Sequence, residues 1–136
     1  MRRMSVSTVV GLITVIGFIA VPAQSASAAN YCPSGQYVQK QYSWAGTVVA
    51  QLCAGSSLTA KATLQSTGRF RGVKKHMALT ICKWNGASTS DCASDSGNFY
   101  DYAGPVRERG GCQRFHSVMG DGAGTTIVNA YWILCD

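Results

Sequence analysis

Residues 58–65 read Leu-Thr-Ala-Lys-Ala-Thr-Leu-Gln, a strict alternation of apolar and polar side chains. Successive side chains of a β-strand point to opposite faces, so this period of two predicts a strand with one face in the core and one in water. The apolar face would consist of Leu58, Ala60, Ala62 and Leu64. The water-facing side would consist of Thr59, Lys61, Thr63 and Gln65.

Further runs of β-branched and aromatic residues lie on both sides of this stretch. Residues 77–84 and 125–135 alternate less cleanly, which is expected of central strands that are covered on both faces. Residues 46–53 predict another strand, and residues 99–107 predict one that Gly104-Pro105 ends or confines to a sheet edge. Turns rich in glycine and serine separate these runs. Together they predict an all-β fold, a small antiparallel β-sandwich or barrel.

Six cysteines lie in the same region, and we expect them to form three disulfides that staple the domain: Cys32, Cys53, Cys82, Cys92, Cys112 and Cys135. Disulfides typically add about 2–4 kcal/mol each to a small secreted domain. Six cysteines allow many pairings, and the sequence alone does not choose among them. We predict the sequential set, Cys32 with Cys53, Cys82 with Cys92 and Cys112 with Cys135, and the turn signal Asn85-Gly86 supports the middle pair. No CxxC pair is present, so the sequence predicts neither a metal site nor a cofactor.

The N-terminal residues have the features of a cleavable secretory signal. Arg2 and Arg3 precede an apolar run at residues 9–21, and small residues follow at residues 26–29. The run falls short of the roughly 20 apolar residues that a membrane-spanning helix needs. We therefore expect residues 1–29 to be a signal peptide and residues 30–136 to form a single secreted β domain with no membrane span.

Positive charge gathers in the first half of the predicted mature chain, where residues 30–90 contain no acidic residue. A candidate basic patch surrounds Phe70 and consists of Arg69, Arg71, Lys74, Lys75 and His76. Such a patch could hold a phosphate-rich wall polymer, whereas a nucleic-acid partner is not expected, because strong binders make roughly six to ten phosphate contacts. The other interpretation, which the pattern fits better, is a solvated loop whose charges only maintain solubility.

The chain contains few residues that could catalyse a reaction. An acid–base hydrolase or nuclease could draw only on His76, Glu108, Arg114 and His116. No GxSxG motif is present, and the glycines of residues 120–124 lack the lysine of a phosphate loop. We expect no enzyme, and a hydrolase or nuclease using His116 and Glu108 stays an alternative.

A secreted protease inhibitor or antagonistic toxin is a further alternative, because a stapled β scaffold could present residues 107–110 to a trypsin-like protease. The aromatic residues Phe99, Tyr100 and Tyr102 are expected to be buried on a sheet face. If they were exposed instead, they would offer a platform for sugar rings or another protein.

Residues 95–106, Asp-Ser-Gly-Asn-Phe-Tyr-Asp-Tyr-Ala-Gly-Pro-Val, followed by Gly111-Cys112, resemble a segment of the spore-associated protein A family of filamentous actinobacteria. The likeness extends to Cys32, residues 34–35 and 46–49 and the penultimate cysteine, with residues 102–106 as its specific part. The chain departs from the family in Cys82, Cys92 and the cluster at residues 69–76. The resemblance implies a small secreted protein found with spores or aerial filaments, with no established catalytic residues.

These observations lead to one functional expectation. We expect a secreted, non-catalytic protein associated with the spore or cell envelope, whose partner is an anionic wall or spore-surface polymer or another secreted protein.

Overall fold

The structure is a computed structural model that describes residues 29–55 and 61–135. Apart from Ala29, the predicted signal peptide lies outside the described residues. Residues 58–60, the beginning of the alternating stretch, also lie outside them. Within the described ranges, no helix is long and apolar enough to cross a membrane.

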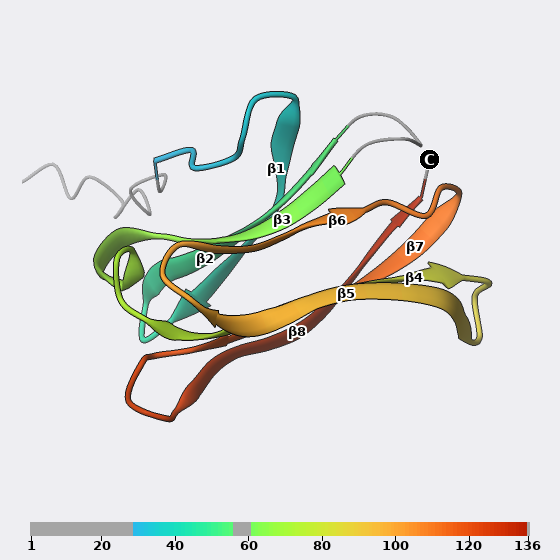
Figure 1. Ribbon diagram of the computed structural model, residues 1–136. Coiled ribbons are helices and arrows are strands. Elements are labelled where there is room, and N and C mark those ends of the chain that lie inside the picture. The colour runs from blue at the N-terminus through green and yellow to red at the C-terminus, as the bar shows by residue number, and fades with distance from the viewer. Residues whose placement is uncertain (1–28, 56–60, 136) are drawn as a thin grey trace, which may run out of the picture.

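The described residues form strands and one short 3₁₀ turn, in this order: β1 (Gln36–Trp44), β2 (Thr47–Gly55), β3 (Lys61–Ser66), η1 (Gly68–Phe70), β4 (Lys75–Trp84), β5 (Thr89–Phe99), β6 (Tyr102–Arg107), β7 (Cys112–Gly120) and β8 (Thr126–Cys135). Neighbouring strands pair antiparallel in two four-stranded sheets (Figure 1). Sheet A has the order β1-β2-β3-β6, and sheet B has the order β5-β4-β7-β8. The predicted all-β sandwich is confirmed.

The core lies between the inner faces of the two sheets. Leu52 and Leu64 are fully buried in sheet A, and Met77, Leu79 and Phe115 are fully buried in sheet B. Burying each of these side chains contributes about 1.5–3 kcal/mol relative to leaving it in water. Apolar packing therefore holds the two sheets against each other.

Three strands were not anticipated from the sequence: β1, β5 and β7. In β7 every second residue from Gln113 to Met119 is buried. Two of those four, Gln113 and Ser117, are polar, and this hides the alternation. The polar β5 has weak strand propensity and forms because it pairs along β4 from Lys75 to Trp84.

The predicted position of residues 125–135 in the centre of a sheet is wrong. This segment is β8, which lies at the edge of sheet B and pairs only with β7 among the described strands. Trp132 and Leu134 pack against the core, while Tyr131 and Ile133 on the other side are exposed. Because both faces of β8 carry aromatic or β-branched residues, the sequence of this edge strand has the pattern of a strand that is covered on both faces.

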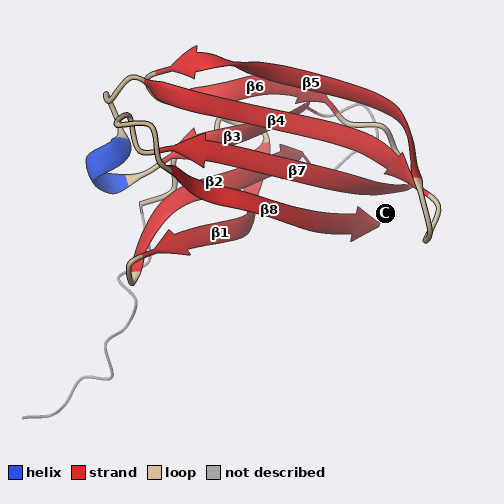
Figure 2. Ribbon diagram, turned by 90° about the horizontal axis from the view of Figure 1, so that it is seen from below, coloured by secondary structure: helices blue, strands red, loops and turns tan. Residues whose placement is uncertain are grey.

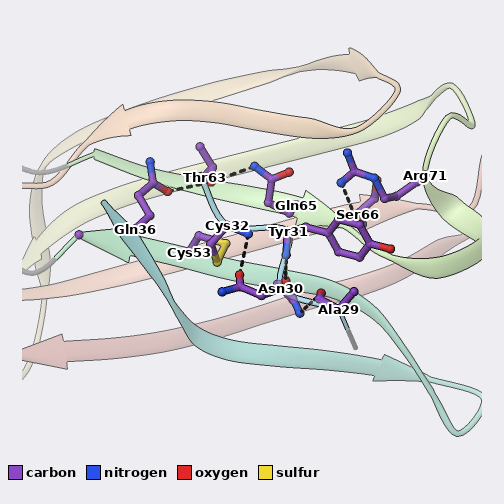
Figure 3. Close-up of a disulfide and its surroundings, with 12 residues drawn as sticks. Ala29, Asn30, Tyr31, Cys32, Gln36, Cys53, Thr63, Gln65, Ser66 and Arg71 are labelled. Carbon is purple, nitrogen blue, oxygen red and sulfur yellow. Dashed lines mark hydrogen bonds between the residues drawn. A yellow bond between two sulfur atoms is a disulfide. The ribbon is translucent and has the colours of Figure 1, made fainter. Parts of the chain in front are cut away.

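The predicted water-facing side of β3 is exposed only at Lys61. Ala62 and Leu64 are buried as expected, but Thr63 and Gln65 are buried too. Figure 3 shows that the N-terminal residues Asn30 to Cys32 lie over this outer face of sheet A. We call the segment Ala29–Cys32 the N-terminal strap.

Hydrogen bonds and a disulfide hold the strap in place. Gln51 binds it twice, donating through Nε2 to the Ala29 carbonyl at 3.1 Å and accepting from the Tyr31 amide at 3.1 Å. Cys32 forms a disulfide with Cys53 of β2. Beside the strap, the Thr63 hydroxyl donates to Gln36 at 2.9 Å. Polar residues in β2 and β3 are thus buried because each finds a partner.

The other two disulfides join neighbouring strands of sheet B. Cys82 of β4 pairs with Cys92 of β5, and Cys112 pairs with Cys135, which lies directly opposite it in β8. All three pairings are those predicted from the sequence.

The sandwich is closed along one side by a contact between the edge strands β5 and β6. The Asp95 carboxylate accepts a hydrogen bond from the Gly104 amide at 2.7 Å. Pro105 follows in β6, an edge strand of sheet A, as its missing N–H predicts.

The strap generates a stability prediction. Replacing Cys32 and Cys53 together by serine should lower the free energy of unfolding by about 3 kcal/mol, because a long loop of the unfolded chain is released. Without the tether, the strap should leave sheet A, so hydrogen exchange should accelerate at the β2 and β3 amides. Urea unfolding and exchange mass spectrometry measure both effects.

The pair Cys82→Ser and Cys92→Ser is the control, because it releases a disulfide in sheet B. This control should destabilise the protein without selectively accelerating exchange in β2 and β3. Equal exchange in β3 for both double variants would contradict the role of the strap.

Candidate functional site

Lys75, predicted to belong to a surface patch, is instead buried at the start of β4 with 2% of its surface exposed. Its Nζ donates to the carbonyls of Phe70, Val73 and Tyr100 at 2.6, 2.8 and 2.5 Å. Three donors thus meet three acceptors, which satisfies the ammonium group away from water. Burial lowers the pKa of Lys75, while the Asp101 carboxylate acts against this effect.

The three carbonyls come from two separate loops. Phe70 ends η1, Val73 lies in the segment leading to β4, and Tyr100 lies in the turn between β5 and β6. In Figures 1 and 2 these segments gather at one end of the sandwich, which we call the loop end. Lys75 therefore ties the loop end together, while its neighbours Lys74 and His76 are exposed.

Arg71 is also engaged in contacts within the protein. Its guanidinium lies 4.3 Å from the centre of the Tyr31 ring and donates to the Ser66 carbonyl at 3.2 Å. Asp101 forms an ion pair with it at 3.8 Å. The same carboxylate accepts a hydrogen bond from the Gly72 amide at 2.8 Å. Arg71 thus joins the strap to the loop end, and its charge is partly neutralised.

Arg69 is exposed but rests on aromatic rings. Its guanidinium carbon lies 4.9 Å from the centre of the Phe70 ring and 5.7 Å from that of Trp44. A cation over an aromatic face is held by the ring quadrupole. The five predicted patch residues therefore divide into one buried lysine, two stacked arginines and two exposed neighbours, Lys74 and His76.

A shallow pocket of about 500 Å³ lies beside these two exposed residues. Its lining comes from the start of β4, the end of β5 and the β7–β8 loop: Lys74, Lys75, His76, Asn98, Gly120, Gly122, Gly124, Thr125 and Thr126. None of these lining residues is acidic. The pocket thus combines cationic, amide and hydroxyl groups, which suits an anionic ligand.

The β7–β8 loop is ordered by its own side chain and by close packing. Asp121 accepts hydrogen bonds from the amides of Ala123 at 2.7 Å and Thr125 at 3.1 Å, and these bonds lower the pKa of its carboxyl. At Gly122 (φ +89°) a Cβ atom would lie 2.8 Å from Val73 Cγ1 and 3.1 Å from the Lys74 carbonyl oxygen. The sequence shows only a glycine-rich turn here and gives no sign of a pocket wall.

The aromatic residues at residues 99–102 divide between core and surface. Phe99 packs against the core as expected, but Tyr100 and Tyr102 are 56% and 48% exposed. Burial of all three was therefore a wrong prediction. Tyr102 is paired with Gln65, so it lies on the strap side of sheet A, away from the outer face of sheet B.

The outer face of sheet B is open, whereas the strap covers that of sheet A. In Figure 2 no other described element lies across sheet B on this side. Residues directly opposite each other in neighbouring strands share a face, so the register places these side chains outward: Ser94, Ser96, Asn98, His76, Ala78, Thr80, Arg114, His116, Val118, Asn129, Tyr131 and Ile133. None of these twelve residues is acidic. His76 and Asn98 also line the pocket, so the pocket and this face are continuous.

Five side chains form a connected row on this face: Trp84, Arg114, Tyr131, His116 and Asn129. The Arg114 guanidinium lies 3.8 Å from the centre of the Tyr131 ring and 5.5 Å from that of Trp84. His116 stacks on the same tyrosine with a centroid distance of 4.3 Å and an interplanar angle of 14°. On its other side, His116 Nε2 lies 2.7 Å from Asn129 Oδ1. The row is therefore fixed before any ligand arrives.

His116 and Glu108, the predicted pair of a hydrolase, are not brought together. Glu108 is buried, where it accepts hydrogen bonds from the Gly55 amide at 2.8 Å and from Gln113 at 3.1 Å. Gln113 points into the core, whereas His116 points outward from the same strand. The two side chains thus lie on opposite faces of sheet B.

The predicted inhibitor loop at residues 107–110 is held rather than projected. Besides the buried Glu108, the loop contains Arg109, whose amide donates to Gln113 at 2.9 Å. Its guanidinium lies 3.9 Å from Asp91. Arg107, the other basic residue of this segment, is exposed at the end of β6.

Among the described residues, no group of three or more His, Cys, Asp and Glu side chains could hold a metal ion. No family model, curated protein or solved structure matches the chain. The resemblance at residues 95–106 therefore stays a prediction.

The Lys75 network generates a stability prediction. Lys75→Met should lower the free energy of unfolding by about 3 kcal/mol, because three carbonyl groups lose their donor at once. The matched change at its exposed neighbour, Lys74→Met, should alter stability by less than about 0.5 kcal/mol. Urea unfolding of the oxidised protein compares the two. Similar losses in both variants would show that the buried ammonium does not organise the loop end.

Proposed function

We propose that the protein is a secreted, non-catalytic binding protein of the spore or cell envelope. It binds anionic groups of an envelope polymer at the pocket of the loop end. The observation that carries this proposal is a pocket lined by Lys74 and His76 without an acidic residue among its lining side chains.

The compartment is consistent with this role. All six cysteines are joined in disulfides, which form and persist in oxidising environments such as the extracellular space. Without Arg2 and Arg3 of the predicted signal peptide, the net charge of +6 falls to +4, which still favours approach to an anionic surface. The pocket, which has no acidic lining residue, adds local positive charge to this long-range attraction.

The basic residues of the predicted patch have different roles, and only some of them can face a ligand. Lys75 and Arg71 use their charges to hold the loop end, so Lys74 and His76 are the groups left to face a ligand. A lysine near an anionic surface contributes about 1 kcal/mol to attachment. Binding through this pocket is therefore modest for one anionic group and grows when a polymer offers many of them.

The test is retention on isolated cell walls and intact spores. The purified, oxidised protein should bind and be released at moderate salt, because screening weakens exposed charge pairs. Lys74→Ala should weaken retention about fivefold, and His76→Ala should weaken it as well, because both side chains line the pocket. Bound protein is measured along a salt gradient.

Lys61→Ala is the matched control, since Lys61 is exposed at the start of β3 and does not line the pocket. It removes the same charge and should leave retention nearly unchanged. Equal effects of Lys61→Ala and Lys74→Ala would show that retention depends on the net charge of the protein and not on the pocket. Binding that persists at high salt would contradict an electrostatic contact altogether.

A further inference from the structure

Exposed apolar side chains gather at the tip of the loop end. Trp44, Val73 and Tyr100 are 38%, 37% and 56% exposed. The buried Lys75 holds two of them together, because its Nζ binds the carbonyls of both Val73 and Tyr100. The third carbonyl on this ammonium belongs to Phe70, whose ring centre lies 6.5 Å from that of Trp44. Trp44, Val73 and Tyr100 thus form one cluster, which we call the apolar tip.

Trp44 reaches the apolar tip from the tight turn between β1 and β2. It pairs with Thr47 across a turn of two residues, Ala45 and Gly46, which both have positive φ angles. This turn lies at the same end of the sandwich as η1 (Figure 2). The Arg69 guanidinium, 5.7 Å from the centre of the Trp44 ring, connects the turn to η1. The apolar tip is therefore carried by turns at the end of the sandwich and not by a sheet face.

Positive charge borders the apolar tip. Arg69 and Lys74 are exposed, and Arg71 is half-buried. The acidic residues of the described loops at this end are Asp101, which forms the ion pair with Arg71, and Asp121, which accepts hydrogen bonds from amides of its own loop. The exposed cations Arg69 and Lys74 have no such carboxylate partner among the described residues. The tip therefore complements a surface that is both anionic and partly apolar.

We infer that the apolar tip docks on the surface of an anionic lipid bilayer. The rings of Trp44 and Tyr100 and the side chain of Val73 enter the headgroup region, and Arg69 and Lys74 contact lipid phosphates. Tryptophan and tyrosine are the residues that favour the membrane–water interface, and nearby cations add attraction to anionic headgroups. This inference goes beyond the proposed polymer binding, because none of the three residues of the tip lines the pocket.

The size of the apolar tip favours a bilayer over a protein partner. A stable protein interface covers about 800 Å² on each side, which is more than three partly exposed side chains provide. Peripheral attachment to a membrane needs only a small apolar surface at headgroup depth together with cations beside it. Both components are present at this end of the sandwich.

The experiment measures co-sedimentation of the full mature, oxidised protein with lipid vesicles. One set contains equal parts of phosphatidylcholine and phosphatidylglycerol, and the other contains phosphatidylcholine alone. The protein should bind the anionic vesicles and not the neutral ones. Trp44→Ala should weaken binding about tenfold and Tyr100→Ala about fivefold, because each removes apolar area that leaves water on docking.

Tyr37→Ala is the matched control. Tyr37 is 59% exposed, but it lies at the opposite end of β1 from Trp44. This variant should bind anionic vesicles like the parent. Equal effects of Tyr37→Ala and Trp44→Ala, or failure of the parent to bind anionic vesicles, would overturn the docking.

Fluorescence tests whether the tip enters the lipid. Brominated lipids quench tryptophan at short range, so binding to brominated anionic vesicles should reduce the fluorescence of the parent. Trp44→Phe keeps an aromatic ring and should retain most of the binding, but it should lose most of the quenching. Quenching that persists in Trp44→Phe would place another part of the protein against the membrane.

Retention on isolated cell walls separates this inference from the proposed function. Trp44→Ala should leave wall retention unchanged, while Lys74→Ala weakens it. If Lys74→Ala weakened vesicle binding but Trp44→Ala and Tyr100→Ala did not, the pocket alone would attract the headgroups and the docking of the tip would be wrong. Equal loss of wall retention in Trp44→Ala and Lys74→Ala would assign the tip to the polymer instead of the bilayer.

Discussion

The loop end depends on a single buried ammonium group. Lys75 donates to three carbonyls in two loops and thereby joins η1 to the β5–β6 turn. A buried charge without partners would cost several kcal/mol, so the loops must keep their carbonyls directed at it. Their conformation leaves Lys74 and His76 on the surface, next to the β7–β8 loop. The pocket is thus a consequence of how one lysine is buried.

One outer face of the sandwich is covered, and the other is open. On sheet A the strap, tethered by the disulfide between Cys32 and Cys53, covers polar side chains that find partners there. On sheet B the face stays open, with Arg114, His116 and Tyr131 arranged by mutual stacking. Covering one face restricts flat binding surfaces to the other. The pocket and the open face meet at His76.

The sequence was a good guide where one local rule applied. The pairing of Cys82 with Cys92 and the edge position of Pro105 were both predictable, because turn signals and the missing proline N–H act locally. It was a poor guide where distant segments decide. Burial of Gln65 depends on the strap, burial of Lys75 on carbonyls from two loops, and exposure of Tyr131 on which strand ends the sheet. The pocket combines three segments that are separated in the chain, so no local pattern marks it.

The most direct test of the central claim is a map of the contact surface. Amide chemical shifts of the isotope-labelled protein would be followed by NMR during titration with a soluble anionic polymer. The account predicts that perturbations gather at residues 74–76 and 120–126, while the strap and β2 stay unchanged. Perturbations centred on sheet A, or spread evenly over exposed lysines such as Lys61, would contradict it.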